Sequence, residues 1–308
     1  SSFFNLNLRF SIFLTQSILY LSFLILVFNY FKNLKINIIQ LFALFAPIFL
    51  LYPVAEIEAL GRKEIILFVF FISLIHFAGS KFSKNIVNLQ IIIVLPFICF
   101  IWEQVALFFP FMGSVILIKN KFKTFKESFI KLLLIFLPSI LSVIIIFAFP
   151  LSLDGHKIMA NVLMNEFGER CYMSCRLLIT NTIYFDSPYI LEKVSFVPLF
   201  RYMCIFLIGF LPLNYLIFKS KFVKNQNFIS KNFKVFSFFF LLYSPSLLLF
   251  LYGYDWGRWI HITYTFSILF YFYLFKNNLI KFKEDIRFNN LTNYINKKKF
   301  LLIFTFII

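Results

Sequence analysis

The chain has 308 residues, of which 61% are hydrophobic and only 14% are charged. Soluble globular domains have roughly 45–50% apolar and about 25% charged residues, so a soluble enzyme, a disordered tail and a coiled coil are excluded. The net charge of +17 does not indicate nucleic-acid binding. The basic residues fall in short loops between apolar runs, where they act as topology signals for a membrane protein.

Apolar runs of membrane-spanning length recur along the whole chain and predict an all-α, polytopic transmembrane helix bundle of nine to ten spans. The nine candidate spans cover residues 9–31, 36–53, 65–79, 86–102, 104–118, 131–150, 196–218, 235–252 and 258–275. A partial tenth begins near residue 300. Because the chain also starts without Met, we expect a fragment that forms a single integral membrane domain over 1–308.

The run over 86–118 is too long for one helix, since roughly 20 residues suffice to cross a bilayer. A single helix would also place Glu103 at its centre, where a charge is costly. Two short helices that meet at Trp102, Glu103 and Gln104 avoid both problems. The sequence therefore predicts a helical hairpin with Glu103 at its tip.

The alternation of spans then assigns each loop to a side. Most Lys residues fall on one side, which includes a basic segment over 276–299, and the positive-inside rule makes this side cytoplasmic. Most acidic residues and most Arg residues fall on the other side. Arg binds carboxylate or phosphate through two parallel hydrogen bonds, so this segregation indicates a binding site at the outer face.

Two outer segments in the N-terminal part of the chain carry candidate site residues. Glu56 and Glu58 could serve as a base or as metal ligands, and Arg62 could bind an anion. The alternative is a solvated hairpin tip with internal ion pairs. Glu103 is a candidate general acid or base, because burial raises the pKa of a carboxyl group. The alternative for Glu103 is a charge exposed at the membrane surface beside an interfacial Trp102.

The sharpest local pattern opens the last complete span. Asp255 can cap the helix that follows, and the first turns of that helix carry the candidate ligand-binding residues Trp256, Arg258, Trp259 and His261. Arg beside aromatic rings can hold a phosphorylated or sugar ligand by charge and by stacking. The alternative is a helix cap with interfacial Trp residues and an Arg side chain that reaches toward water.

The longest loop covers residues 151–195 and is predicted to lie in the periplasm. Long loops without a span are often functional, and Arg170 and Arg176 are candidate ligand-binding residues in it. Part of the loop, about 156–180, fits an interfacial helix. Cys171 and Cys175 lie on the predicted oxidising side, where a disulfide between them is an open alternative to free thiols. No Cys/His metal spacing is present.

The stretches LGRKEI (60–65), WEQVALFFP (102–110) and YDWGRW (254–259), together with the span layout, resemble the oligosaccharide repeat-unit polymerases of bacterial envelopes (Wzy and EpsG types). A second large Arg-bearing loop, which complete members have, is not visible here. The resemblance implies a multi-pass protein of the bacterial inner membrane.

The resemblance implies that the chain joins glycan repeats carried on a polyprenyl diphosphate at the periplasmic face. Arg62 and Arg258, with Arg170 or Arg176, would bind the diphosphate, and Glu103 or Asp255 would be the base. Trp256 and Trp259 would stack on sugars. No cofactor and no metal are implied, and the partners are the lipid-linked glycan, membrane lipid and other envelope-glycan assembly proteins. The alternatives are another lipid-linked-sugar glycosyltransferase and a transporter or flippase of the glycan.

Overall fold

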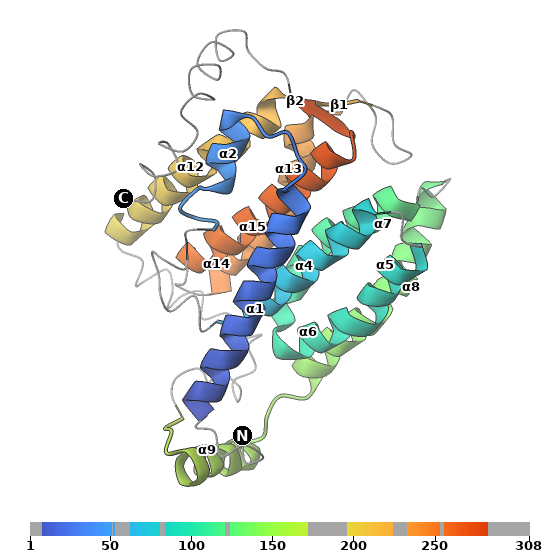
Figure 1. Ribbon diagram of the computed structural model, residues 1–308. Helices are drawn as coiled ribbons and strands as arrows, with labels where there is room; N and C mark the ends of the chain where they lie inside the picture. Colours follow the sequence, from blue (N-terminus) through green and yellow to red (C-terminus); the bar gives the residue numbers. More distant parts are fainter. Residues whose placement is uncertain are drawn as a thin grey trace.

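The computed structural model describes residues 8–50, 52, 62–80, 84–120, 124–171, 196–223, 233–252 and 256–282. Over these residues the fold is a bundle of helices, whose arrangement is shown in Figure 1. The α-helices are α1 (Leu8–Phe31), α2 (Ile38–Leu44), α4 (Glu64–Gly79), α5 (Lys84–Leu89), α6 (Leu95–Ile101), α7 (Phe109–Asn120), α8 (Phe125–Ala148), α9 (Leu153–Phe167), α12 (Phe196–Lys219), α13 (Val235–Tyr243), α14 (Leu249–Tyr252) and α15 (Trp256–Lys276).

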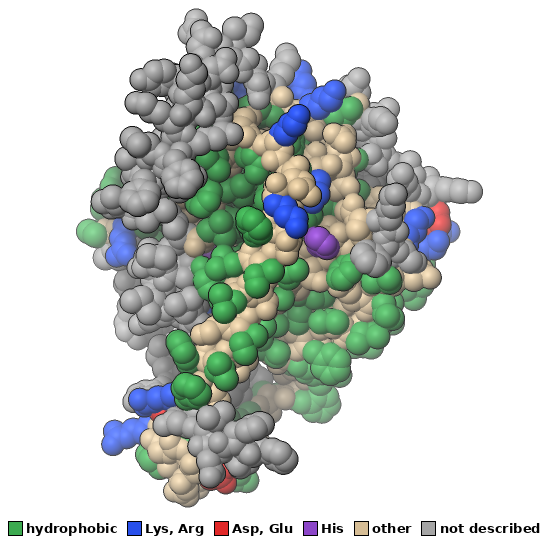
Figure 2. Space-filling model, in the orientation of Figure 1, with side chains coloured by type: hydrophobic (Ala, Val, Ile, Leu, Met, Phe, Trp, Pro, Cys, Tyr) green, Lys and Arg blue, Asp and Glu red, His purple; other side chains and the backbone are tan. Residues whose placement is uncertain are grey.

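Four helical stretches among these residues are long and apolar enough to cross a membrane: α1, residues 84–101, α8 and the stretch Leu199–Lys219 of α12. Only 11–28% of the residues in their most apolar windows are buried. Figure 2 shows a broad band of hydrophobic side chains across the middle of one face. Apolar surface of this extent requires a nonaqueous neighbour, so the structure supports a membrane protein, whereas the predicted count of nine to ten spans stays a prediction.

Helix α15 forms the centre of the bundle, because every residue from Trp259 to Leu274 is buried. Aromatic rings surround it: Phe266 stacks on Phe71 of α4 at 4.3 Å between ring centroids and on Phe108 at 4.7 Å. A helix that is buried on all sides belongs to the core. The many Phe residues of the sequence therefore provide much of the packing between helices.

The predicted hairpin over 86–118 is present. The first arm consists of α5, a π-helical segment (Gln90–Val94) and α6; the second consists of a 3₁₀ segment (Glu103–Phe108) and α7. Trp102 joins them in an extended conformation (φ −155°, ψ 101°). At the far ends Lys84 Nζ donates to Asn120 O at 3.3 Å, and Asn120 Nδ2 donates to Asn88 Oδ1 at 3.0 Å. The arms are therefore antiparallel.

The end of the bundle opposite Trp102, which we call the Lys119 end, is formed by carboxyl-terminal helix turns and Lys side chains. Lys119 Nζ donates to Ala78 O at 3.0 Å and to Ser80 O at 2.8 Å. Lys276 Nζ donates to Tyr30 O at 2.8 Å. Lysines near helix C-termini neutralise the partial negative charge of unpaired carbonyl groups. The Lys segregation in the sequence thus corresponds to one end of the fold. Of the predicted basic segment 276–299, residues 283–299 lie outside the described residues.

The span predicted over 36–53 is wrong as a continuous helix. Asn37 caps α2 and forms a capping box with Gln40, but α2 ends at Leu44. The prediction counted apolar residues and extended the helix past Pro47, although a proline three residues beyond Leu44 is a signal for a helix end. By contrast, the predicted span 235–252 is helical throughout, and a 3₁₀ segment (Ser244–Leu248) that contains Pro245 joins α13 to α14. Since proline lacks an N–H group, it breaks the α-helical hydrogen-bond pattern.

The fold also contains a small antiparallel ribbon that an all-α prediction omits. Strand β1 (Ser220–Phe222) follows α12 directly and pairs with β2 (Ile280–Phe282), which follows α15. Both strands are only three residues long, too short for a periodic pattern in the sequence to reveal them. The ribbon links the ends of α12 and α15 at the Lys119 end (Figure 1).

The loop predicted over 151–195 begins with α9, which Ser152 caps and Gly168 ends in a left-handed conformation (φ 66°). No residue of α9 is buried. Cys171 is disulfide-bonded, whereas Cys99 and Cys204 are free. Cys175, the predicted partner of Cys171, lies outside the described residues, as do all residues of this loop from 172 to 195. The helix predicted over about 156–180 is thus present as α9, but it begins at Leu153 and ends at Phe167.

An ion pair joins α1 to the residues after α9. Arg9 Nη2 donates to Glu169 Oε2 at 2.9 Å, and Arg9 Nε donates to Glu169 Oε1. Hydrogen bonds from Arg9 lower the pKa of the Glu169 carboxyl group below its usual value. Because this group has a lower pKa when paired, the pairing is present at neutral pH and is lost as the pH falls through the lowered pKa.

We therefore expect α9 to separate from α1 in acid. Spin labels attached to cysteines introduced at Ile12 and Asn161 should give a narrow distance distribution at pH 7 and a broad one well below the usual pKa of Glu. Glu169→Gln should broaden the distribution already at pH 7. An unchanged distribution in both tests would show that Arg9 and Glu169 do not hold the two helices together.

Candidate functional site

Three segments that are distant in the sequence meet at the end of the bundle opposite Lys119. They are the start of α4, the hairpin tip at Trp102 and the first turn of α15. We call this end the Arg258 end. The sequence places the segments on one side by alternation of spans, and for the described residues the structure agrees.

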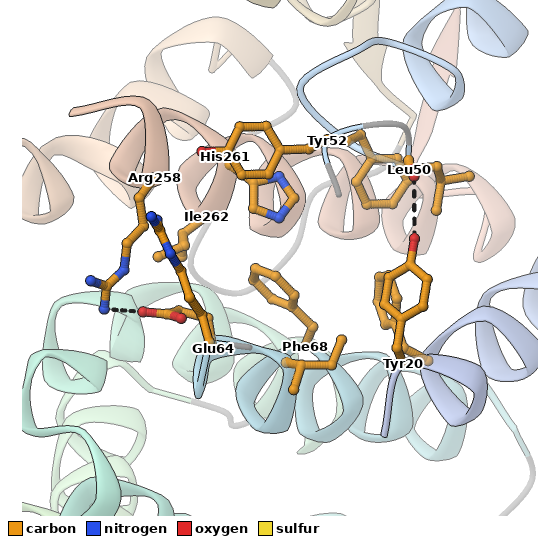
Figure 3. Close-up of a pocket in the computed structure, with 12 residues that line it drawn as sticks. Tyr20, Leu50, Tyr52, Glu64, Phe68, Arg258, His261 and Ile262 are labelled. Atoms are coloured by element: carbon orange, nitrogen blue, oxygen red, sulfur yellow. Dashed lines mark hydrogen bonds and ion pairs between the residues drawn. The ribbon is translucent and has the colours of Figure 1, made fainter. Parts of the chain in front are cut away.

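A buried ion pair is the centre of the site. The Arg258 guanidinium group pairs with the carboxylate of Glu64, which is only 4% exposed (Figure 3). Two indole rings lie beside the same guanidinium group: its Cζ atom is 4.7 Å from the ring centroid of Trp259 and 5.7 Å from that of Trp102. The two indoles are nearly parallel, with an 8° interplanar angle. Cation–π attraction therefore adds to the ion pair in holding Arg258.

Lys63 and Glu103 extend this charged group toward the hairpin tip. Lys63 Nζ donates to Ile101 O at 3.0 Å. Burial lowers the pKa of the Lys63 ammonium group, while Glu103 and then Glu64 oppose that shift by stabilising the charged form. Glu103 is partly exposed and opens the 3₁₀ segment, and Trp102 Nε1 donates to Gln104 Oε1 at 3.1 Å. The two carboxylates and two cations form one electrostatic cluster.

A pocket lies beside the ion pair, between α1, α4, α15 and the segment that follows α2. Its empty volume is about 530 Å³, including the part open to solvent. The polar and charged side chains in its wall are Tyr20, Tyr52, Arg62, Glu64, Arg258 and His261, and the remainder is apolar. Figure 3 shows the aromatic and charged side chains directed into this space from different helices. The pocket therefore combines cationic groups with aromatic faces.

His261 lies deep in the pocket wall in a defined orientation. Its Nδ1 is 2.8 Å from Ile48 O, and because a carbonyl only accepts, Nδ1 carries the proton. The ring stacks on Tyr52 at 4.2 Å between centroids and meets the edge of Phe68 at 5.2 Å. With Nδ1 donating, Nε2 is the nitrogen of the neutral ring that can accept a proton.

The structure brings five of the predicted site residues to the Arg258 end: Arg62, Glu103, Arg258, Trp259 and His261. Arg62, Arg258 and His261 line the pocket. Glu103 lies near Lys63, and the pocket wall does not include it.

Two other predicted residues lie elsewhere. Trp256 donates through Nε1 to Phe250 O at 3.1 Å and packs edge-on against Tyr202 of α12, outside the pocket wall. Arg170 is exposed beyond α9 and does not line the pocket either. Asp255, Arg176, Glu56 and Glu58 lie outside the described residues.

Glu64, the partner of Arg258, was not among the residues predicted for the site. A signal for it exists: Glu64 is the first residue of an otherwise apolar helix, and a carboxylate at such a position needs a cation. Tyr52 was also not expected at the site, and Trp102 was expected only as an interfacial residue beside Glu103, because the ring contacts of both join residues far apart in the sequence. Among the described residues no group of three or more His, Cys, Asp or Glu side chains could hold a metal ion.

Comparison of the chain with protein-family models, with curated proteins and with solved structures found no match.

Proposed function

We propose that the chain polymerises polyprenyl-diphosphate-linked oligosaccharide repeat units at the periplasmic face of a bacterial inner membrane. The observation that carries this proposal is the pocket at the Arg258 end, where Arg62 and Arg258 lie beside aromatic rings at one end of an apolar bundle. Arginine binds phosphate groups through paired hydrogen bonds, and aromatic faces suit sugar rings. A lipid-linked, anionic sugar donor matches both properties and the membrane location.

In this proposal the diphosphate of the donor binds Arg62 and displaces Glu64 from Arg258. The acceptor hydroxyl attacks the anomeric carbon of the donor sugar while the bond from that carbon to the diphosphate oxygen breaks. The guanidinium groups stabilise the negative charge that develops on the leaving diphosphate. Glu103 or Asp255 accepts the proton of the hydroxyl group. The diphosphate is already an activated leaving group, so no nucleotide is required.

Transport of a lipid-linked glycan is the second candidate, and the interruption after α2 favours it. Irregular backbone within a membrane protein is often found where a transporter binds its substrate. A transporter would move the lipid-linked unit without making a bond between sugars. The appearance of longer glycans on the lipid therefore separates the two functions.

The test is a polymerisation reaction with purified protein in vesicles and a synthetic lipid-linked repeat unit. We expect the unmodified protein to produce a ladder of longer glycans on a gel. Arg258→Lys keeps a positive charge for Glu64 but cannot form the paired hydrogen bonds of a guanidinium group. The variant should therefore reduce the polymerisation rate by about tenfold or more. This reduction corresponds to a loss of about 1.4 kcal/mol or more of transition-state stabilisation.

Lys131→Ala serves as the matched control, because it removes a positive charge from the exposed start of α8. It should leave the rate unchanged. A normal ladder from well-folded Arg258→Lys would remove Arg258 from the mechanism. Movement of the lipid-linked unit across the vesicle membrane without any ladder would favour the transporter.

A further inference from the structure

The imidazole ring of His261 lies in the wall of the charged pocket and is only 9% exposed, and its two nitrogen atoms have different surroundings. Nδ1 donates to Ile48 O at 2.8 Å. Nε2 has no hydrogen-bond partner among the described residues, and they do not enclose it. Because buried polar groups are normally hydrogen-bonded, an open Nε2 in a pocket wall marks a position for a polar group of a ligand.

Contacts on three sides hold this ring in one orientation. One face stacks on Tyr52 with an interplanar angle of 14°, and the contact with Phe68 is nearly perpendicular at 89°. The hydrogen bond to Ile48 O fixes the proton on Nδ1, so the lone pair of the neutral ring is on Nε2. A proton acceptor must be held in a fixed position relative to the group that it deprotonates, and these contacts provide that position.

The same ring lies near the cationic groups of the pocket. Arg258 and His261 are three residues apart on α15, so they share a helix face and are separated by about 4.5 Å along the axis. Figure 3 shows both side chains extending from α15 toward α4. Arg62 also lines the pocket, and its charge acts on the His261 ring. A phosphate group bound by the two guanidinium groups therefore places the sugar that it carries beside Nε2.

The other polar side chains at this end are less suited to accept a proton from a ligand in the pocket. The Glu64 carboxylate is paired with Arg258. Tyr20 and Tyr52 carry phenol groups, which are poor bases at neutral pH. Glu103 is not part of the pocket wall. Among the described residues of the pocket, His261 thus provides the neutral base.

We propose that His261 Nε2 is the first acceptor of the proton of the acceptor hydroxyl group, ahead of Glu103 or Asp255. This inference rests on the proposed function and adds a catalytic residue to it. The hydroxyl oxygen bonds to the anomeric carbon, the bond from that carbon to the diphosphate oxygen breaks, and the proton moves to Nε2. The bound diphosphate and the displaced Glu64 carboxylate balance the positive charge of the ring. The ring then releases the proton to a carboxylate or to water and is neutral again.

His261→Asn separates this role from a structural one. The amide nitrogen of Asn is as many bonds from the backbone as His Nδ1 is, so it can still donate to Ile48 O, but Asn has no counterpart of Nε2. In the polymerisation reaction the variant should lower kcat by about 100-fold or more and leave KM for the lipid-linked donor nearly unchanged. The control is His76→Asn in the last turn of α4, outside the pocket wall, which should leave kcat unchanged.

His261→Ala allows a second measurement that a structural role would not affect. Added imidazole should restore part of the rate, and among imidazoles of similar size the restored rate should rise with the basicity of the compound, because proton transfer follows a Brønsted relation. A restored rate that is independent of basicity, or a normal kcat for folded His261→Asn, would overturn the role of His261.

The unmodified protein distinguishes this inference from the function on which it rests. If it produces no ladder of longer glycans, the polymerase and the proton-accepting role of His261 are both refuted. If the unmodified protein and His261→Asn produce ladders at equal rates, the polymerase stands and only the role of His261 is refuted.

Discussion

Replacing Glu64 with alanine should lower the free energy of unfolding by about 3–5 kcal/mol, because removal of one partner leaves the other charge buried without compensation. Glu64 is almost completely buried, and the side chain of Arg258 is only 20% exposed. The indole rings of Trp102 and Trp259 carry no formal charge, so they cannot replace the negative charge of the carboxylate beside Arg258. The measurement is reversible unfolding in mixed micelles, monitored by Trp fluorescence and circular dichroism.

The matched control is Glu127→Ala, which removes the partner of Lys131 in an exposed pair four residues apart on α8. Glu127→Ala should lower the free energy of unfolding by less than about 1 kcal/mol. The double variant Glu64→Ala with Arg258→Ala should recover part of the lost free energy of unfolding, because neither charge of the pair is then left without its partner. Equal effects of Glu64→Ala and Glu127→Ala would show that the pair at the Arg258 end does not stabilise the fold.

Replacing Phe266 with alanine should lower the free energy of unfolding by about 3–5 kcal/mol, as is usual when a large aromatic side chain is removed from a packed core. Phe266 is completely buried in α15, and its ring packs against Phe71, Phe108 and Phe111 at 4.3, 4.7 and 5.5 Å between centroids. The resulting cavity would separate α15 from α4 and from the second arm of the hairpin. The same unfolding measurement gives the loss.

Phe13→Ala is the control for this prediction, because Phe13 is 66% exposed on α1 in the apolar outer surface. The apolar tails of the mixed micelle contact a smaller side chain as well as they contact a larger one, so the change in the free energy of unfolding should be close to zero. A loss at Phe266 no larger than that at Phe13 would contradict the central position of α15.

Much of the candidate site was accessible to sequence reasoning, because charged residues are rare in an apolar chain. Glu103 between two apolar runs predicted the hairpin, and the structure places the break at Trp102, one residue before it. The polar first turn of the last span predicted Arg258 and His261 as pocket residues. The pairing of Arg258 with Glu64 was not predicted, because the two residues are far apart in the sequence and only helix packing brings them together.

The amino-acid sequence by itself determined the class of the protein and the separation of charges between its two ends. Both follow from local quantities, namely the length of apolar runs and the cost of a charge within them. Tertiary structure decided which helix becomes the core and which carboxylate meets which guanidinium group. These outcomes depend on contacts between distant segments. After α2, for example, Ile48 O accepts from His261 and Leu50 O accepts from Tyr20, and both donors belong to other helices.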